Sequence, residues 1–197
     1  EFYWEDGKKT AGKHAAEVKS NLQFKRDSPI SKKFSGIIIK KILSNDLIKS
    51  FALPKKIHGT IFSKSLSGMK YGRHIDNAYM SSGRADLSFT VFLNCKSDFE
   101  GGELSIESFN SEKKFKLDAG EIIIYPSTYL HSVEEVINGE RLVFIGWIES
   151  YVKSIEEREY LFDLDAAARS LLAKYGRSDE VDLIFKSYSN LLRRLGS

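Results

Sequence analysis

The sequence predicts a mainly β protein with flanking helices, in which short antiparallel strands form a sandwich or a barrel. Between about residues 56 and 150, apolar and polar residues alternate in short runs separated by turn residues, which is the pattern of half-buried strands. Helical periodicity precedes and follows this region. Several short strands at this spacing are typical of antiparallel sandwiches and barrels. We expect a single domain over residues 1–197, with its core at about 56–150 and a helical C-terminal extension at about 151–197.

The composition is that of an ordinary globular protein with nearly balanced charge. Of the 197 residues, 42% are hydrophobic, and 30 basic against 27 acidic residues give a net charge of +3. No basic block is interleaved with aromatic residues and no apolar stretch approaches membrane-spanning length, so neither nucleic acid nor a membrane is an expected partner. The single Cys95 cannot form an internal disulfide, and a cytoplasmic location is the default expectation. Because the chain begins at Glu1 without a methionine, a trimmed chain or a fragment is expected.

A short strand or an extended arm, closed by a turn at Asp6-Gly7, precedes two predicted helices. The first helix begins at Thr10, a suitable N-cap, and continues to Leu22, with one face formed by Ala11, Ala15, Val18 and Leu22. The second begins near Ser28-Pro29, because proline suits the first helical turn, and ends around Asn45-Asp46. Its apolar face is expected to lie against a sheet and consists of Phe34, Ile37, Ile38 and Ile42.

Strand periodicity begins after Pro54, where Ile57, Gly59, Ile61 and Ser63 alternate with their neighbours. Ser97–Gly102 is predicted to be a turn. Further strands are predicted at Asp86–Asn94, Glu103–Glu107, Phe115–Leu117, Glu121–Tyr125 and Arg141–Ile148.

In the last of these strands, Arg141 shares a face with Val143, Ile145 and Trp147. An arginine that points into an apolar interior needs compensation, either from an acidic side chain or from a ligand carboxylate.

Two amphipathic helices are predicted after Ser150. The first ends at Gly176, and the second begins with the cap and acidic residues Ser178-Asp179-Glu180 and ends with Arg193-Arg194. Such a pair could pack on the sheet or on a second subunit, and the sequence leaves a homo-oligomer formed through these helices open.

The candidate chemistry lies at His74, Asp76, His131 and Arg141. Two histidines and one carboxylate match the 2-His-1-carboxylate facial triad, which binds iron(II) and leaves positions open. Arg141 follows His131 by ten residues, and a guanidinium binds a carboxylate through two parallel hydrogen bonds. Iron with a carboxylate-bearing cosubstrate suggests 2-oxoglutarate. The alternative interpretation makes His131 an ordinary turn residue and Arg141 an interior ion-pair partner.

These residues, with their neighbours, resemble the prolyl and lysyl hydroxylase branch of the iron(II)/2-oxoglutarate dioxygenases. The motifs are Tyr71-Gly-Arg-His-Ile-Asp-Asn77, Gly101-Gly-Glu-Leu104, Leu130-His131 and Arg141. More narrowly, the chain is similar to the bacterial PKHD-type hydroxylases over almost its whole length. This closer resemblance also involves Asp6-Gly-Lys-Lys-Thr-Ala-Gly12, Val18-Lys-Ser-Asn-Leu-Gln23, Ile123-Ile-Tyr-Pro-Ser127, Trp147-Ile-Glu-Ser150, Leu161-Phe-Asp-Leu-Asp165 and Asn190-Leu-Leu-Arg-Arg194.

The resemblance implies a double-stranded β-helix (jelly-roll) core. It also implies iron(II) held by His74, Asp76 and His131, the distal carboxylate of 2-oxoglutarate held by Arg141, and O2 as the oxidant. Related hydroxylases are commonly linked with L-ascorbate, which keeps the iron reduced. One departure concerns a tyrosine that members often carry before the glycine of the first-ligand strand; Ser65 stands there. Tyr71 and Tyr125 are the candidates for a second contact with 2-oxoglutarate.

The implied activity is hydroxylation of an unactivated C–H bond, with release of succinate and CO2. The substrate is expected to be a peptidyl side chain, of proline or lysine type, or a small metabolite. The loops around Ala78–Ala85 and Ser108–Lys114 carry no signature that chooses between them. A hypothesis from another class is a non-catalytic cupin-like module that binds metal or a small ligand.

Overall fold

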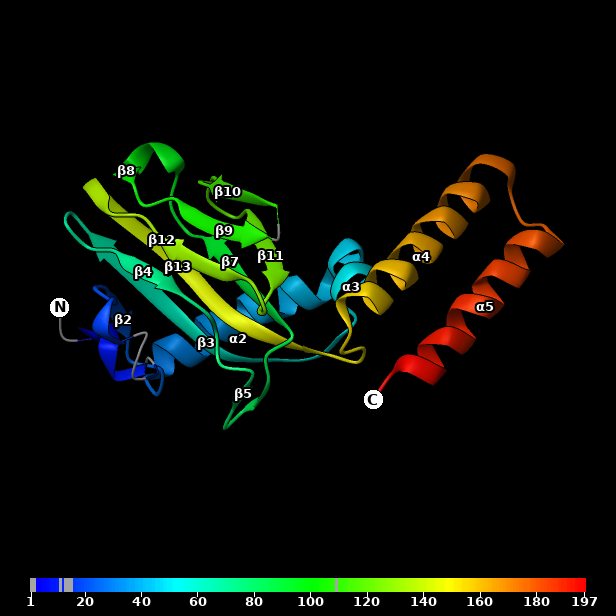
Figure 1. Cartoon of the computed structure of the whole chain (residues 1–197), viewed down its shortest axis with the longest axis horizontal. Helices are drawn as coiled ribbons and strands as arrows, with labels where there is room; N and C mark the ends of the chain where they lie inside the picture. The colour runs from blue at the N-terminus through cyan, green and yellow to red at the C-terminus, as the bar shows by residue number, and fades with distance from the viewer. Residues whose placement is uncertain (1–2, 11, 13–15, 109) are drawn as a thin grey trace. The chain divides into compact units, whose positions relative to one another are not determined.

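A computed structural model describes residues 3–10, 12, 16–108 and 110–197 (Figure 1). The chain divides into two compact units, one comprising residues 1–38 and 57–149 and the other residues 39–56 and 150–197. The expectation of one domain over residues 1–197 stays a prediction. In the described residues, no helix is both long enough and apolar enough to span a membrane.

Two antiparallel sheets dominate the structure and confirm the predicted mainly β class. The larger sheet has the order β1-β2-β3-β13-β7-β11, with β8 paired to β13, and the smaller has the order β10-β9-β12-β4. The strands of the larger sheet are β1 (Trp4–Asp6), β2 (Leu22–Phe24), β3 (Pro54–Leu66), β7 (Leu87–Phe92), β8 (Phe99–Gly101), β11 (Ile122–Pro126) and β13 (Val136–Ser150). Those of the smaller sheet are β4 (Tyr71–His74), β9 (Leu104–Ser108), β10 (Ser111–Phe115) and β12 (Leu130–Val133). A separate hairpin consists of β5 (Tyr79–Met80) and β6 (Gly83–Arg84).

Strand β7 is buried along its whole length, but its two faces differ in chemistry. Leu87, Phe89 and Val91 form an apolar face, while Ser88 and Thr90 lie on the opposite face. Ser88 pairs in register with Tyr125 of β11 on one side and Trp147 of β13 on the other. Small hydroxyl side chains at the centre of a buried face leave room and hydrogen-bonding capacity for a polar site.

The predicted helix from Thr10 to Leu22 is wrong in its second half. Leu22 begins strand β2, and Lys19 forms an antiparallel bridge with Tyr71 of β4. Residues 7–10 form a short 3-10 helix, and Ala11 and Ala15 lie outside the described residues. The apolar residues here recur at helical spacing, but the segment pairs with the edges of strands instead of continuing as a helix. Such pairing is a long-range interaction, which local periodicity does not reveal.

The second predicted helix is confirmed as α2 (Pro29–Ser44), which is followed by α3 (Asp46–Ala52). Its predicted apolar face is partly wrong, because Phe34 and Ile37 are 49% and 50% exposed while Ser31 is buried. Ile42 of the predicted face is buried. The buried side of the helix therefore runs from Ser31 to Ile42, and a serine at its start was not indicated by the apolar residues alone.

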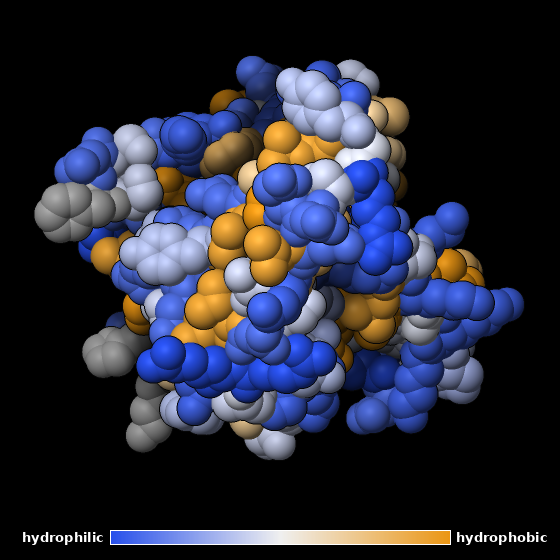
Figure 2. Space-filling model, turned by 90° about the vertical axis from the view of Figure 1, so that its right-hand side faces the viewer, coloured by the Kyte–Doolittle hydropathy of each residue, from blue (hydrophilic) through white to orange (hydrophobic). Residues whose placement is uncertain are grey.

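The C-terminal helices are confirmed as α4 (Ile155–Tyr175) and α5 (Asp179–Leu195). Ser178 caps α5 by accepting a hydrogen bond from the backbone N–H of Val181, as its position predicts. Leu53, Val152 and Leu161 form an apolar cluster in this unit, and its partly buried neighbours are Tyr188, Leu192 and Leu195. Apolar residues also reach the surface on the side seen in Figure 2, and the exposed ones in these helices include Leu172, Leu183 and Leu191. A homo-oligomer through this pair stays a prediction.

Candidate metal centre

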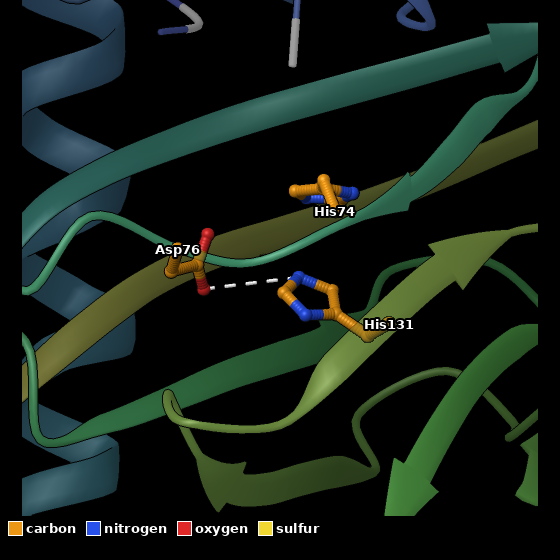
Figure 3. Close-up of side chains that lie close together, drawn as sticks. All are labelled: His74, Asp76 and His131. Carbon is orange, nitrogen blue, oxygen red and sulfur yellow. Dashed lines mark ion pairs between the residues drawn. The ribbon is translucent and has the colours of Figure 1, made fainter. Parts of the chain in front are cut away.

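The smaller sheet brings together two histidines that are far apart in the sequence. His74 ends β4 and His131 lies in β12, and the two residues are opposite each other in the antiparallel register. Asp76 lies two residues beyond β4, so its carboxylate turns toward the same place (Figure 3). One ligand atom from each of the three side chains lies within 4.8 Å of the others, and Asp76 Oδ2 is 3.7 Å from His131 Nε2. This arrangement could hold one metal ion.

Backbone carbonyl groups orient both imidazole rings. His74 Nδ1 lies 2.8 Å from the carbonyl oxygen of Gly72, and His131 Nδ1 lies 3.1 Å from that of Tyr129. Because a carbonyl oxygen only accepts, each Nδ1 donates its proton and leaves Nε2 with a free lone pair. A hydrogen bond of this kind fixes the tautomer of metal-binding histidines.

Burial also favours the metal-binding form of His74. It lowers the pKa of His74 to about 4, and the neighbouring His131 acts in the same direction. At neutral pH the imidazole is therefore uncharged, which is the form that coordinates a cation.

A serine on the facing sheet holds the carboxylate. Ser88 Oγ donates a hydrogen bond of 2.6 Å to Asp76 Oδ2 and lies 2.7 Å from Ser127 Oγ. Both serines are buried. Ser88 thus holds Oδ2, the same Asp76 oxygen that lies 3.7 Å from His131 Nε2, and so orients the carboxylate at the ligand cluster.

Replacing Ser88 with alanine is expected to weaken metal binding about 10- to 100-fold, which is typical for loss of a group that supports a metal ligand. The fold should persist, since the change removes one hydroxyl. Iron(II) affinity measured by competition with a chelator gives the answer. Ser132→Ala, on β12 beside His131, serves as the control, and equal affinities for both variants would contradict a role for Ser88.

Arg141 is buried and has no acidic partner in an ion pair within the described residues. Its exposed fraction is 3%, its Nε has no hydrogen-bond partner, and its guanidinium carbon lies 5.4 Å from the centre of the Phe92 ring. Burial lowers the pKa of Arg141 to about 10, against which Tyr125 and Glu103 act weakly. The group remains a cation at neutral pH. Of the two compensations that the sequence predicts for an interior arginine, an acidic ion-pair partner is not found among the described residues.

The two candidate tyrosines lie against the two histidines. The Tyr71 ring stacks on His74, with centres 3.6 Å apart, and the Tyr125 ring meets His131 edge-on at 5.2 Å. Tyr125 is buried, and burial raises its pKa, with the charge of Asp76 adding to the effect and that of Arg141 opposing it. Tyr125 is therefore within electrostatic reach of both Asp76 and Arg141, whereas Arg141 does not act on Tyr71.

Sequence reasoning did not identify Ser88, Ser127 or Lys19. Ser88 interrupts an otherwise apolar strand, and its alternation with Leu87 and Phe89 was a usable signal of a polar interior face. Lys19 carried no such signal, because its predicted helix placed it on a surface.

Comparison with known proteins identifies the family. Residues 60–149 match the model of the 2OG-Fe(II) oxygenase superfamily, and residues 156–196 match the PKHD-type hydroxylase C-terminal domain. A PKHD-type hydroxylase of Prochlorococcus marinus strain MIT 9215 is 79% identical over 98% of this chain and 87% of its own length. Another, from strain MIT 9312, is 75% identical over 98% of this chain and 88% of its own.

The fold has a counterpart among solved structures. A prolyl hydroxylase from Trichoplax adhaerens, solved in complex with a hypoxia inducible factor peptide fragment, superimposes with a TM-score of 0.54 at 15% identity, covering 81% of this chain and 74% of that one. At this identity the likeness concerns the fold, and it agrees with the expected jelly-roll core. The family assignment favours an enzyme over the cupin-like binding module. The chain belongs to the PKHD-type hydroxylases of the 2OG-Fe(II) oxygenase superfamily, and it is an iron(II)- and 2-oxoglutarate-dependent dioxygenase.

Proposed function

We propose that this enzyme hydroxylates an unactivated C–H bond of a peptidyl side chain of proline or lysine type. In this proposal His74, Asp76 and His131 hold iron(II), and Arg141 holds the distal carboxylate of 2-oxoglutarate. The observation that carries it is the pairing of a three-residue ligand cluster with a buried arginine whose Nε has no partner.

The donor set fits iron(II). Two imidazoles and one carboxylate are the ligands of the facial triad, and each Nε2 keeps a lone pair for a metal ion when Nδ1 donates its proton to a backbone carbonyl. When bound, the iron supplies the chemistry that couples decarboxylation of 2-oxoglutarate to insertion of one oxygen atom from O2 into a C–H bond. L-Ascorbate as reductant and a cytoplasmic location stay predictions.

The chain's own residues contribute position and charge. Arg141 offers a fork of N–H donors to a planar carboxylate, in an environment that strengthens the interaction because water is excluded. The hydroxyl of Tyr125 is the better placed of the two candidate tyrosines for a second contact, since Arg141 and Tyr125 influence each other's pKa. Tyr71 is the better placed to hold the His74 ring by stacking.

A peptide substrate is favoured by the surface around the ligands. Ile75, between the two ligands of the His74-x-Asp76 motif, is 54% exposed, and Tyr79 of the following hairpin is 74% exposed. Large apolar side chains held in solvent beside a polar centre often mark a contact surface. The solved prolyl hydroxylase of similar fold carries a peptide fragment, which supports the same choice.

The direct experiment is an anaerobic titration of the metal-free protein with iron(II) and 2-oxoglutarate. We expect the visible charge-transfer band of a chelated ketoacid, followed by succinate once oxygen is admitted. A band without succinate under any substrate pool would leave the protein a binding module. Stimulation of succinate formation by free metabolites but by no peptide would replace the peptidyl substrate with a small molecule.

A further inference from the structure

Lys19 lies at the open edge of the smaller sheet, on the same face as the candidate metal ligands. The segment before β2 adds to β4, since Ser20 N–H donates to the carbonyl of Lys70 and Gly72 N–H to that of Val18. Lys19 is bridged to Tyr71 in this pairing, and paired residues of antiparallel strands point to one face. Lys19 Nζ lies 4.8 Å from the centre of the Tyr71 ring, and that ring stacks on His74.

The side chain of this lysine is buried, and its amino group has no ion-pair partner among the described residues. Its exposed fraction is 5%, and in the part of the chain that the structure describes its amino group makes no hydrogen bond and no ion pair. The pKa of Lys19 is lowered to about 8, chiefly by burial and also by the charge of Arg26, and the carboxylates of Asp76 and Asp6 oppose this shift. Lysine is seldom buried unless paired, so an amine with no ion pair among the described residues is suited to bind an anionic ligand.

The anion is not 2-oxoglutarate if Arg141 holds that molecule. The two charges of iron(II) cancel those of 2-oxoglutarate, and Asp76 cancels Arg141. Lys19 then leaves the loaded site with an excess positive charge. A negatively charged group on the substrate would neutralise it.

Further cations continue from Lys19 along the same unit. Arg26, whose charge acts on Lys19, lines an open groove of about 290 Å³ with Lys32 of α2. Burial lowers the pKa of Arg26 and the neighbouring carboxylate of Asp27 raises it, and neither Arg26 nor Lys32 forms an ion pair within the described residues. The remaining lining residues are small or carry hydroxyl groups: Ser31, Ser35, Gly59, Thr60, Ser81 and Ser82.

One residue that lines the groove, Gly59, lies against Trp147. A Cβ on Gly59 would come within 2.6 Å of the Trp147 ring, so the groove lining and this indole are in contact. Trp147 pairs in register with Ser88, which holds Asp76. Its Nε1 is buried and has no hydrogen-bond acceptor in the described part of the chain.

We infer that the enzyme selects acidic peptides, with Lys19 binding an Asp or Glu carboxylate of the substrate beside the metal centre and Arg26 and Lys32 binding further acidic residues along the groove. The inference rests on the proposed peptidyl hydroxylase function and specifies its substrate. Nucleic acid is the less suited polyanion, because the groove carries serine and glycine where base stacking needs aromatic side chains. Three separate cations also exceed what a single terminal carboxylate would satisfy.

The test is a binding measurement that needs no turnover. The full chain, loaded with zinc(II) and 2-oxoglutarate, is titrated into rhodamine-labelled peptide amides containing two copies of Gly-X-Pro-Gly, where X is Glu, Gln or Lys. Fluorescence anisotropy should show the Glu peptide binding about tenfold more tightly than the Gln peptide, the size expected for one partly buried charge pair. A Gln peptide with a free C-terminal carboxylate and a labelled oligothymidine are added as competing sources of negative charge.

Two variants and one control test whether Lys19 and Arg26 cause the preference for the Glu peptide. Lys19→Met should abolish the preference for Glu and Arg26→Gln should reduce it about threefold, whereas Lys70→Met, an exposed lysine paired with Glu135, should retain it. The affinity for 2-oxoglutarate, measured by calorimetry, should be unchanged in Lys19→Met. Any one of three results would overturn the inference. The first is equal binding of the Glu and Gln peptides, and the second is a preference for the free carboxylate or for oligothymidine. The third is a loss of 2-oxoglutarate affinity in Lys19→Met.

Thermal stability separates this role from a structural one. If Lys19 served only to support the Tyr71 ring, Lys19→Met would lower the melting temperature of the metal-free protein. A buried cation kept for a ligand destabilises the folded state below its lowered pKa, so we expect Lys19→Met to melt several degrees higher at pH 7. Succinate formation is measured separately. Charge-selective binding without succinate would count against the hydroxylase proposal. Succinate formation with unselective binding would count against acidic-peptide selection.

Discussion

Asp76→Ala is expected to abolish 2-oxoglutarate turnover while leaving the protein folded. The carboxylate is the single anionic ligand among the three candidate side chains, and no other acidic residue in the described chain joins that cluster. Loss of a supporting residue costs about 10- to 100-fold in activity, so loss of a ligand should bring turnover to background. His74→Ala should have the same effect, since it removes one of the two imidazoles.

The fold should survive because Asp76 contributes little packing. Its contacts are the hydrogen bond from Ser88 and the approach to His131, and the free energy of unfolding should change by about 1 kcal/mol or less. Succinate assays and circular dichroism measure the two quantities. Asp163→Ala, on the exposed side of α4, is the control. Normal succinate release by Asp76→Ala would refute the triad.

Arg141→Met should weaken the binding of 2-oxoglutarate while iron(II) still binds. Truncating one partner of a buried charge pair costs about 2 to 5 kcal/mol, which corresponds to a loss of roughly 30-fold or more in affinity. Methionine keeps most of the side-chain volume near Phe92, so the interior should not collapse. Calorimetry with 2-oxoglutarate and separate metal titrations distinguish the two losses.

The same substitution should stabilise the protein in the absence of ligands. Burial depresses the pKa of Arg141 from its usual value to about 10, so carrying the charge destabilises the fold at every pH below that value, and the penalty is relieved only as pH rises above it. Replacing unpaired buried charge with an apolar side chain is often stabilising by about 1 to 4 kcal/mol. Arg193→Met, at an exposed site on α5, controls for loss of charge. Unchanged cosubstrate affinity in Arg141→Met would move the anchor elsewhere.

Sequence periodicity was sufficient for the elements whose signal is local. Helices α4 and α5 were predicted because their apolar residues recur at helical spacing between capping residues such as Ser178 and Gly176. The two-residue spacing of His74 and Asp76 is read directly from the sequence, and the parity that places Arg141 with Trp147 follows from strand geometry. The family resemblance supplied the rest of the candidate site, and the comparisons confirm the family.

Only the tertiary structure decided which polar groups meet inside the protein. Ser88 supports Asp76 because β7 lies opposite the smaller sheet, and Lys19 reaches the site because its segment pairs with β4 rather than continuing a helix. The exposure of Phe34 and burial of Ser31 likewise depend on what packs against α2. Local sequence patterns reflect backbone preference and average hydrophobicity. These placements depend instead on contacts between segments that are distant in the sequence, and no short stretch of the sequence specifies such contacts.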